Sequence, residues 1–332
     1  MALHPFRFGV TAPTVLSGPA WVERARRIEQ LGYSIVHVPD HFRDQLAPVP
    51  ALTAAAMATT GLRVGSLVFS NDFRHPVVLA KEAATIDVLS GGRFELGLGS
   101  GWLREEYDQA GISFDAPGTR IERLTEAVSI VKGLLGGGPV TFAGRHYTIT
   151  GLQGRPSPVQ RPHPPILIGG GGPRTLSLAA REASIVGLVP RARRDGGGLD
   201  RGDFGEAALR EKVGWVRDAA GDRFETLELH ALIQAVVVTD QRMAAAEQLA
   251  ARFRVGREVV LESPYVLIGT VDEICETLRQ RRESYGVSYL TVFDRDLEVF
   301  APVVERLAWL RDAAPELPAP TRAHQTRGCH LP

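Results

Sequence analysis

Short apolar runs alternate with helical patterns along most of this chain, and this alternation limits the folds that it can adopt. Segment 17–31 repeats apolar residues with the helical period, 49–59 is an expected helix rich in alanine, and 76–89 is a third expected helix closed by Gly91 and Gly92. Several of the short runs are apolar on successive residues, as in strands covered on both faces within a parallel sheet. The expected strands are 6–11, 34–39, 62–69, 93–99, 165–168, 184–189, 227–238 and 288–293.

Eight strands that mostly alternate with helices favour a closed (β/α)₈ TIM barrel, an α/β fold in which helices surround a ring of parallel strands. An open, doubly wound sheet is the alternative. Insertions are expected after the fourth and seventh strands, and the first should contain a helix at 121–135 and an extended pair at 140–142 and 146–149. We expect one domain over residues 1–315 and a polar, flexible tail at 316–332.

The composition excludes several functional classes. The 38 basic residues balance the 38 acidic ones, which argues against nucleic-acid binding. We expect no signal peptide, because the N-terminus has no basic stretch followed by an apolar core. We expect no membrane span, because the longest apolar run, at 235–238, is far shorter than the ~20 residues that cross a bilayer. Cys275 and Cys329 are the two cysteines, and we expect no disulfide, no metal site and a cytoplasmic location.

Polar or small residues follow four of the expected strands, at the end where (β/α)₈ enzymes place their active sites. Asp40 and His41 follow the second strand. A histidine here can act as a general acid or base, or donate a hydrogen bond to an anionic cofactor. The alternative is that Asp40 caps the next turn and His41 is a satisfied polar residue. The other strand-end residues are Ser70, Asn71, Ser100, Gly101, Trp102, Gly169, Gly170, Gly171 and Gly172.

The run of four glycines precedes a helix that opens at Pro173. Glycines let a ligand approach the backbone closely, and free N–H groups at a helix start bind anions, so a phosphate site is favoured over a simple flexible turn. Trp102 is interpreted either as a wall for a flat ring or as a packed core residue. Glu105, Glu106 and Tyr107 are expected to begin a short helix, where carboxylates suit the helix dipole.

A loop is expected at 191–203, where glycines and charges are too frequent for scaffold. Its cluster of Arg191, Arg193 and Arg194 is typical of a solvated loop, although these side chains can also reach an acidic cofactor tail.

Several longer segments resemble the luciferase-like monooxygenase superfamily. The segment from Arg74 reads RHPVVLAKEAATIDVLSGGRFELGLGSGW and resembles the family's third helix, the turn after it and its fourth strand. Further matches are VPDHF at 38–42, PVTFAGRHY at 139–147 and PSPVQRPHPPILIGGGG at 156–172. Together they cover most of residues 6–310, and the combination is highly specific for the superfamily.

The resemblance implies a (β/α)₈ barrel with a cofactor lying across the carboxyl ends of the strands. It implies a bulge after the third strand, often with a non-proline cis peptide bond, which maps onto Ser70 and Asn71. It also maps phosphate contacts onto Gly170–Gly172. The cofactor contacts expected on this basis are Asp40, His41, Ser70, Asn71, Ser100, Gly101, Trp102, Gly169, Gly170, Gly171 and Gly172.

Within the superfamily, the chain looks most like the members that use the deazaflavin coenzyme F420, with Asp40 and His41 as catalytic residues. Such an enzyme transfers a hydride between the reduced deazaflavin and a small organic substrate. A related sugar-phosphate dehydrogenase has a glutamate where Trp102 stands here, so its full acid–base mechanism and its substrate do not carry over.

Two alternatives remain within the resemblance. One is an FMN-dependent monooxygenase that uses oxygen and receives reduced FMN from a separate reductase. The other is a non-catalytic barrel that has lost the cofactor. The resemblance further implies a homodimer.

Overall fold

The computed structural model describes residues 4–308, and its centre is a closed parallel barrel. Among the described residues, eight strands pair in the ring order β3–β2–β1–β13–β10–β9–β8–β5, and β5 pairs in turn with β3. The closed ring confirms the predicted barrel and excludes an open sheet. The barrel strands are β1 (Arg7–Thr11), β2 (Ile35–Val38), β3 (Arg63–Ser66), β5 (Phe94–Gly99), β8 (Ile166–Gly170), β9 (Ile185–Leu188), β10 (Glu228–Leu232) and β13 (Val287–Phe293).

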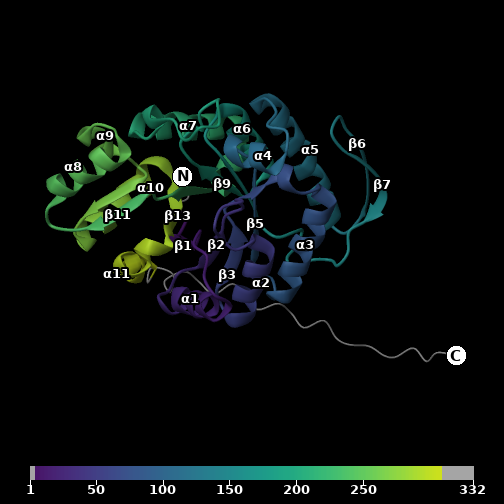
Figure 1. The fold of residues 1–332 in the computed structure, drawn as a ribbon, viewed down its shortest axis with the longest axis horizontal. Helices are drawn as coiled ribbons and strands as arrows, with labels where there is room; N and C mark the ends of the chain where they lie inside the picture. The colour runs from purple at the N-terminus through teal and green to yellow at the C-terminus, as the bar shows by residue number, and fades with distance from the viewer. Residues whose placement is uncertain (1–3, 309–332) are drawn as a thin grey trace.

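Helices surround this ring (Figure 1). Each barrel strand is followed by one of them before the next barrel strand begins or the described chain ends. They are α1 (Gly18–Gln30), α2 (Pro48–Ala58), α3 (Pro76–Leu89), α5 (Pro117–Leu135), α6 (Pro173–Glu182), α7 (Glu206–Ala220), α10 (Val271–Tyr285) and α11 (Leu297–Ala308).

Local sequence signals account for these helices. In α1, Trp21, Ala25 and Ile28 recur with the helical period and are the buried face. Proline occupies the first turn of α1, α2, α3, α5 and α6, where its missing N–H costs no hydrogen bond. Thr270 and Glu273 form a capping box at the start of α10.

The strands alternate between two environments. Phe8 and Val10 of β1 lie in the main hydrophobic core. Gly9 faces the barrel interior, where a Cβ atom on it would meet the side chains of Thr291 and His37. The barrel therefore has an apolar outside that packs on the helices and an inside that includes polar residues.

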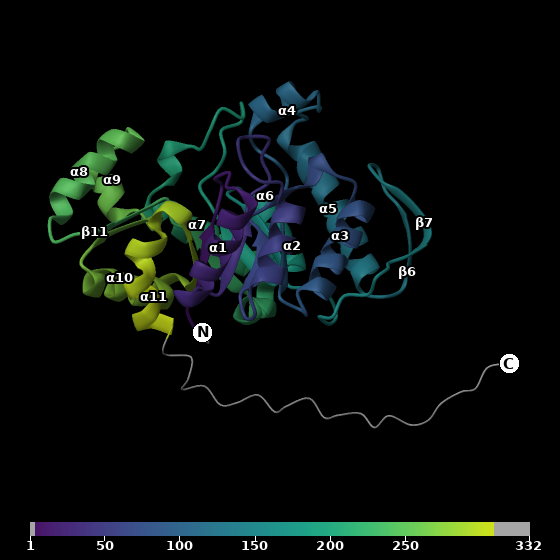
Figure 2. The ribbon, with the colours of Figure 1, turned by 60° about the horizontal axis from the view of Figure 1, so that its bottom comes forward.

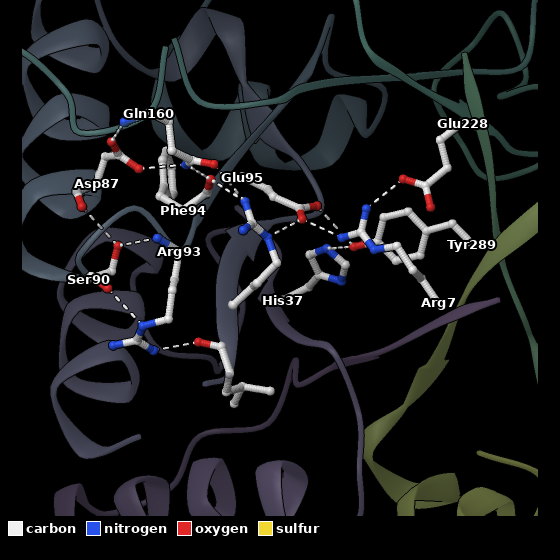
Figure 3. A network of polar contacts seen from close by, with 12 residues as sticks. Arg7, His37, Asp87, Ser90, Arg93, Phe94, Glu95, Gln160, Glu228 and Tyr289 are labelled. Carbon is white, nitrogen blue, oxygen red and sulfur yellow. Dashed lines mark hydrogen bonds and ion pairs between the residues drawn. The ribbon is translucent and has the colours of Figure 1, made fainter. Parts of the chain in front are cut away.

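Charged residues fill the interior at the end where the strands begin (Figure 3). Glu95 is buried and forms ion pairs with Arg7 and Arg63, and Arg7 also pairs with Glu228. Although burial opposes it, the two guanidinium groups hold the pKa of Glu95 below its ordinary value. The Tyr289 hydroxyl donates to Glu95 across 3.3 Å. This network closes the base of the barrel.

Two insertions follow barrel strands, and the hairpin of the first and the helices of the second lie at opposite ends of the molecule, as both views show (Figures 1 and 2). After β5 come the short helix α4 (Arg104–Ala110), α5 and an antiparallel hairpin of β6 (Pro139–Ala143) and β7 (Thr148–Gln153). After β10 come β11 (Ala235–Val238), α8 (Arg242–Phe253), α9 (Arg257–Glu262) and β12 (Val266–Gly269). Both positions agree with the prediction.

The expected single strand at 227–238 is wrong, because it is two strands. Ile233 donates its N–H to Thr291 beside the barrel, whereas the next residue, Gln234, donates to Tyr265 of the insertion. The chain changes hydrogen-bonding partner between these residues, so β10 stays in the barrel and β11 pairs with β12 in a separate sheet.

No helix among residues 4–308 is long and apolar enough to cross a membrane. Cys275 is buried in α10. The expected tail at 316–332, which contains Cys329, lies outside the described residues.

Candidate functional site

Asp40 follows β2 at the carboxyl end of the barrel. Both of its carboxylate oxygens are engaged: Arg74 donates to them across 2.6 and 3.2 Å, and the Ser70 N–H donates to Oδ2 across 3.0 Å. The side chain is only 7% exposed. Asp40 therefore ties the end of β2 to the segment between the third strand and α3.

His41 points to a carboxylate that the sequence had assigned to helix-dipole stabilisation. Its Nδ1 atom lies 2.8 Å from Oε2 of Glu106, which is buried at the start of α4. The rings of His41 and Trp102 make a T-shaped contact with centroids 6.0 Å apart. A carboxylate at Nδ1 favours the proton on that nitrogen and leaves Nε2 as the acceptor.

His37 and His41 stand four residues apart but do not form a metal pair. The Nε2 atom of His37 lies 3.1 Å from the Tyr289 hydroxyl inside the barrel, whereas His41 lies at the mouth beside Glu106. The described part of the chain contains no group of three or more His, Cys, Asp or Glu side chains that could hold a metal ion.

The third strand is interrupted where it reaches the mouth. β3 ends at Ser66, and pairing with β5 resumes at β4 (Phe69–Ser70). A non-proline cis peptide bond joins Leu67 to Val68, so the expected position at Ser70–Asn71 is wrong. The strand is interrupted at Leu67 and Val68, between β3 and β4, and Ser70 belongs to β4.

This break brings Val68 over a floor of glycines. A Cβ atom on Gly97 would lie 1.9 Å from the Ser66 carbonyl oxygen, and one on Gly99 would lie 2.6 Å from the Val68 side chain. Val68 also contacts the position where a Cβ of Gly169 would be, at 3.5 Å. Leu67 and Val68 are half-buried, and both pack on apolar side chains of the barrel interior. The middle of the mouth is thus an apolar surface.

Tyr107 links the third and fourth strand ends. Its hydroxyl donates to Asp72 across 3.1 Å and lies 3.4 Å from Oγ of Ser70. Burial, together with the Asp72 carboxylate, raises the pKa of Tyr107 to about 12. Tyr107 is therefore a neutral hydrogen-bonding group in the physiological range.

Asn71 begins the 3₁₀ turn η1 (Asn71–Phe73) and is almost fully buried. Its amide donates to the hydroxyl of Tyr147, beside the β6–β7 hairpin, across 3.4 Å. The side chain is thus held against the first insertion.

The fourth strand end is shaped by its neighbours. Gly101 has φ +73°, and a Cβ on it would lie 1.8 Å from the Tyr107 hydroxyl. Arg120 of α5 donates to the carbonyl groups of Ser100 and Gly101. Trp102 is half-buried. Its burial is intermediate between that of a packed core residue and that of an open wall for a flat ring.

The glycine run divides into two parts. β8 continues through Gly170, beyond the predicted end at Ile168. Cβ atoms on Gly170 and Gly171 would lie 2.5 Å from Thr175 and 2.7 Å from the Arg191 backbone, so protein packing explains these two glycines. No described residue lies within 4 Å of a Cβ position on Gly172, which stands at the N-terminus of α6 without a side-chain cap.

The loop at 191–203 is held at both ends by one buried carboxylate. Asp203 accepts from the Arg191 N–H at 2.6 Å and pairs with Lys212 of α7 at 2.5 Å; Asp203 and Lys212 are both fully buried. Ala192 and Leu199 form an antiparallel bridge within the loop. The segment is a loop, as predicted, but it packs in a defined conformation.

The structure thus brings Asp40, His41, Ser70, Gly101 and Trp102 into one connected group. The glycine run lies across Val68 from them, and Asn71 turns toward the hairpin. Sequence reasoning missed several contributing side chains. Glu105 and Glu106 both stand at the expected start of a helix, and only the contact with His41 distinguishes Glu106 from Glu105. The missed residues are Val68, Asp72, Arg74, Glu106, Tyr107 and Arg120.

Comparison with known families and curated proteins places this geometry in context. The profile of the luciferase-like monooxygenase family matches residues 3–289. An F420-dependent glucose-6-phosphate dehydrogenase of Microbacterium testaceum is 32% identical over 200 residues, which are 58% of this chain and 58% of that protein. An F420-dependent hydroxymycolic acid dehydrogenase of Mycobacterium tuberculosis is 29% identical over 236 residues, 69% of this chain and 62% of that protein. The chain therefore spans about three fifths of the length of these relatives.

Solved structures share the fold over nearly the whole chain. The coenzyme F420-dependent tetrahydromethanopterin reductase of Methanopyrus kandleri has a TM-score of 0.72 at 17% identity, covering 92% of this chain and 100% of that one. EDTA monooxygenase from Chelativorans sp. BNC1 has a TM-score of 0.75 at 14% identity, covering 93% and 94%. At these identities the likeness concerns the fold.

Proposed function

The chain belongs to the luciferase-like monooxygenase family, and on that premise we propose that it is an oxidoreductase dependent on coenzyme F420. The single observation that carries the proposal is the contact of His41 with the buried carboxylate of Glu106 at the barrel mouth. The names of the relatives from Microbacterium and Mycobacterium support the choice of cofactor. Fold alone would not do so, because one fold serves many reactions.

The residues at the mouth fit a phosphate-bearing tricyclic cofactor. The half-buried Leu67 and Val68 offer an apolar surface for a flat ring. Gly172 and the uncapped N-terminus of α6 offer free N–H groups and space to a phosphate. When bound, F420 supplies hydride transfer.

Within this arrangement His41 would hold or move a proton at Nε2. Glu106 orients the ring through its contact with Nδ1. Asp40 would act as a positioning residue, because its carboxylate is committed to Arg74 and to the Ser70 N–H. The substrate would be a small organic molecule. A sugar phosphate is disfavoured because, by the family resemblance, Trp102 stands where a related sugar-phosphate dehydrogenase has a glutamate.

Cofactor titration of the purified protein tests the proposal. Separate titrations with F420 and FMN, followed by quenching of cofactor fluorescence, should give saturable binding of F420 and at least tenfold weaker binding of FMN. Tight binding of FMN with none of F420 would overturn the choice of cofactor. Binding of neither would favour a non-catalytic barrel.

The FMN-dependent monooxygenase is the second candidate. It is favoured by the family's own description, and the apolar surface of Leu67 and Val68 suits either ring. Such an enzyme would consume oxygen and need a separate reductase. Oxygen uptake in the presence of reduced FMN would support it.

We also propose a homodimer. Phe42 before α2, Met57 on α2 and Val78 on α3 are large apolar side chains that are 55%, 65% and 49% exposed. Helices α2 and α3 pack side by side, so their exposed residues can contribute to one interface. Sedimentation analysis should give twice the mass of the chain, and a monomer at micromolar concentration would contradict the proposal.

A further inference from the structure

A pocket of about 310 Å³ lies between the 191–203 loop and the insertion that follows β10. One wall comes from the loop and Phe204, the other from the end of α8, from α9 and from the start of β12. Ser263 joins the walls, because its hydroxyl donates to the Phe204 carbonyl across 2.7 Å. The volume is in the range of small-molecule sites.

The lining is mostly apolar and only partly buried. Phe204 and Phe253 lie with ring centroids 6.4 Å apart, and Val255 and Val259 are half-buried beside them. Partly exposed apolar side chains around one hollow gain free energy when an apolar ligand removes them from water. The lining therefore favours a hydrocarbon body.

The charge at the pocket comes from two arginines of the loop. Arg193 is committed, because it pairs with Asp195 at 2.6 Å. Arg201 also lines the pocket, is exposed, and has no hydrogen bond or ion pair with any residue between 4 and 308. Its guanidinium group is thus available to an anion, and carboxylates match its geometry.

The wall that carries these arginines is preformed. The buried pair of Asp203 with Lys212 anchors the loop, and Arg104 of α4 donates its backbone N–H to Gly196 and its Nε to the Asp195 carbonyl. A ligand would therefore not have to order the loop when it binds, which lowers the entropic cost of binding.

We propose that this pocket is a binding site for an amphipathic carboxylate, with Arg201 receiving the carboxylate and the phenylalanine and valine walls receiving the hydrocarbon. None of the residues that line the pocket belongs to the proposed cofactor site. A ligand here would contact the loop, and the loop is bonded to α4, the helix that carries Glu106 beside His41.

Isothermal titration of the full chain with octanoate, without cofactor, tests the proposal. Wild type should bind one equivalent saturably. R201Q should weaken binding about tenfold, since it removes a charge-assisted hydrogen bond. Val259→Asp should weaken it at least as much by placing a like charge against the ligand. R194Q is the matched control, since Arg194 is an exposed arginine of the same loop that does not line the pocket, and it should change affinity less than twofold.

Octanol serves as the neutral ligand and should bind at least about tenfold more weakly than octanoate. Absence of saturable octanoate binding, equal losses in R201Q and R194Q, or equal affinity for octanol would each overturn the proposal. Because Arg201 is exposed, R201Q decides the question even if Val259→Asp unfolds. R201Q should leave the affinity for F420 unchanged. Failure of the carboxylate proposal can therefore be told apart from failure of the cofactor proposal.

Discussion

Nδ1 of His41 lies 2.8 Å from Oε2 of Glu106, although 65 positions separate the two residues in the chain. The histidine follows a barrel strand and the glutamate begins a short helix of the first insertion. Their contact joins the barrel scaffold to the element that covers its mouth.

Glu106→Gln should lower turnover by about tenfold to hundredfold, since it keeps the shape of the side chain but removes the charge that orients His41. Hydride transfer to an accepted substrate is the activity measured. An independent readout is the ¹⁵N spectrum of the His41 ring, which should lose its preference for a proton on Nδ1. Glu105→Gln is the matched control, because Glu105 is exposed and its side chain accepts a hydrogen bond only from Gln109 among residues 4–308. Equal effects of both variants would contradict the role of Glu106.

Arg74→Met should lower the free energy of unfolding by about 3 kcal/mol, because it leaves the buried Asp40 carboxylate without its ion pair. Urea denaturation measures the loss. Adding Asp40→Asn should recover part of it, since the buried charge is then absent. The control is Arg43→Met: this side chain is 60% exposed and lies 3.5 Å from Glu106, so it should cost less than about 1 kcal/mol.

Gly101→Ala should destabilise the protein more than Gly111→Ala. Both glycines have positive φ, +73° and +69°, which costs alanine about 1 kcal/mol at either position. At Gly101 the added methyl group would also collide with the Tyr107 hydroxyl, whereas at Gly111 no residue between 4 and 308 lies within 4 Å of it. Urea denaturation of the two variants isolates the steric contribution; equal losses would show that Tyr107 moves away freely.

Acidification should destabilise the folded protein through the histidines inside the barrel. Burial, aided by Arg7, lowers the pKa of His37 to about 3, so the unfolded chain binds a proton there between about pH 6.5 and 3 while the folded chain does not. Stability is complete above this window and falls as the pH decreases through it. His37 should contribute a loss of about 2 kcal/mol between about pH 7 and pH 5.

His37→Gln removes this contribution, so its unfolding free energy should fall less steeply with decreasing pH than that of wild type. The comparison uses urea denaturation at several pH values and depends on the slope, not on the absolute stability. His230, whose pKa burial also lowers, remains in both proteins. Parallel slopes would contradict the assignment to His37.

The sequence predicted the barrel well, because its signals are local. Strand runs, helical periods and first-turn prolines each extend over a few residues, and α3 has the predicted bounds Pro76–Leu89. The prediction failed where a bond to a distant residue decides the outcome. The split of 227–238 depends on partners in β13 and beside β12, more than thirty residues further along the chain.

The same division holds at the site. The sequence by itself determined which residues follow the barrel strands, and parallel strands in a ring bring Asp40 and Ser70 to one end. Only the tertiary structure decided the partners of these residues. Arg74 forms an ion pair with Asp40, and Glu106 orients His41. Protein packing rather than a ligand accounts for Gly170 and Gly171. The physical reason is that strand ends are set by local hydrogen-bonding and apolar periodicity, whereas the partner of a side chain is set by which distant segment folds against it.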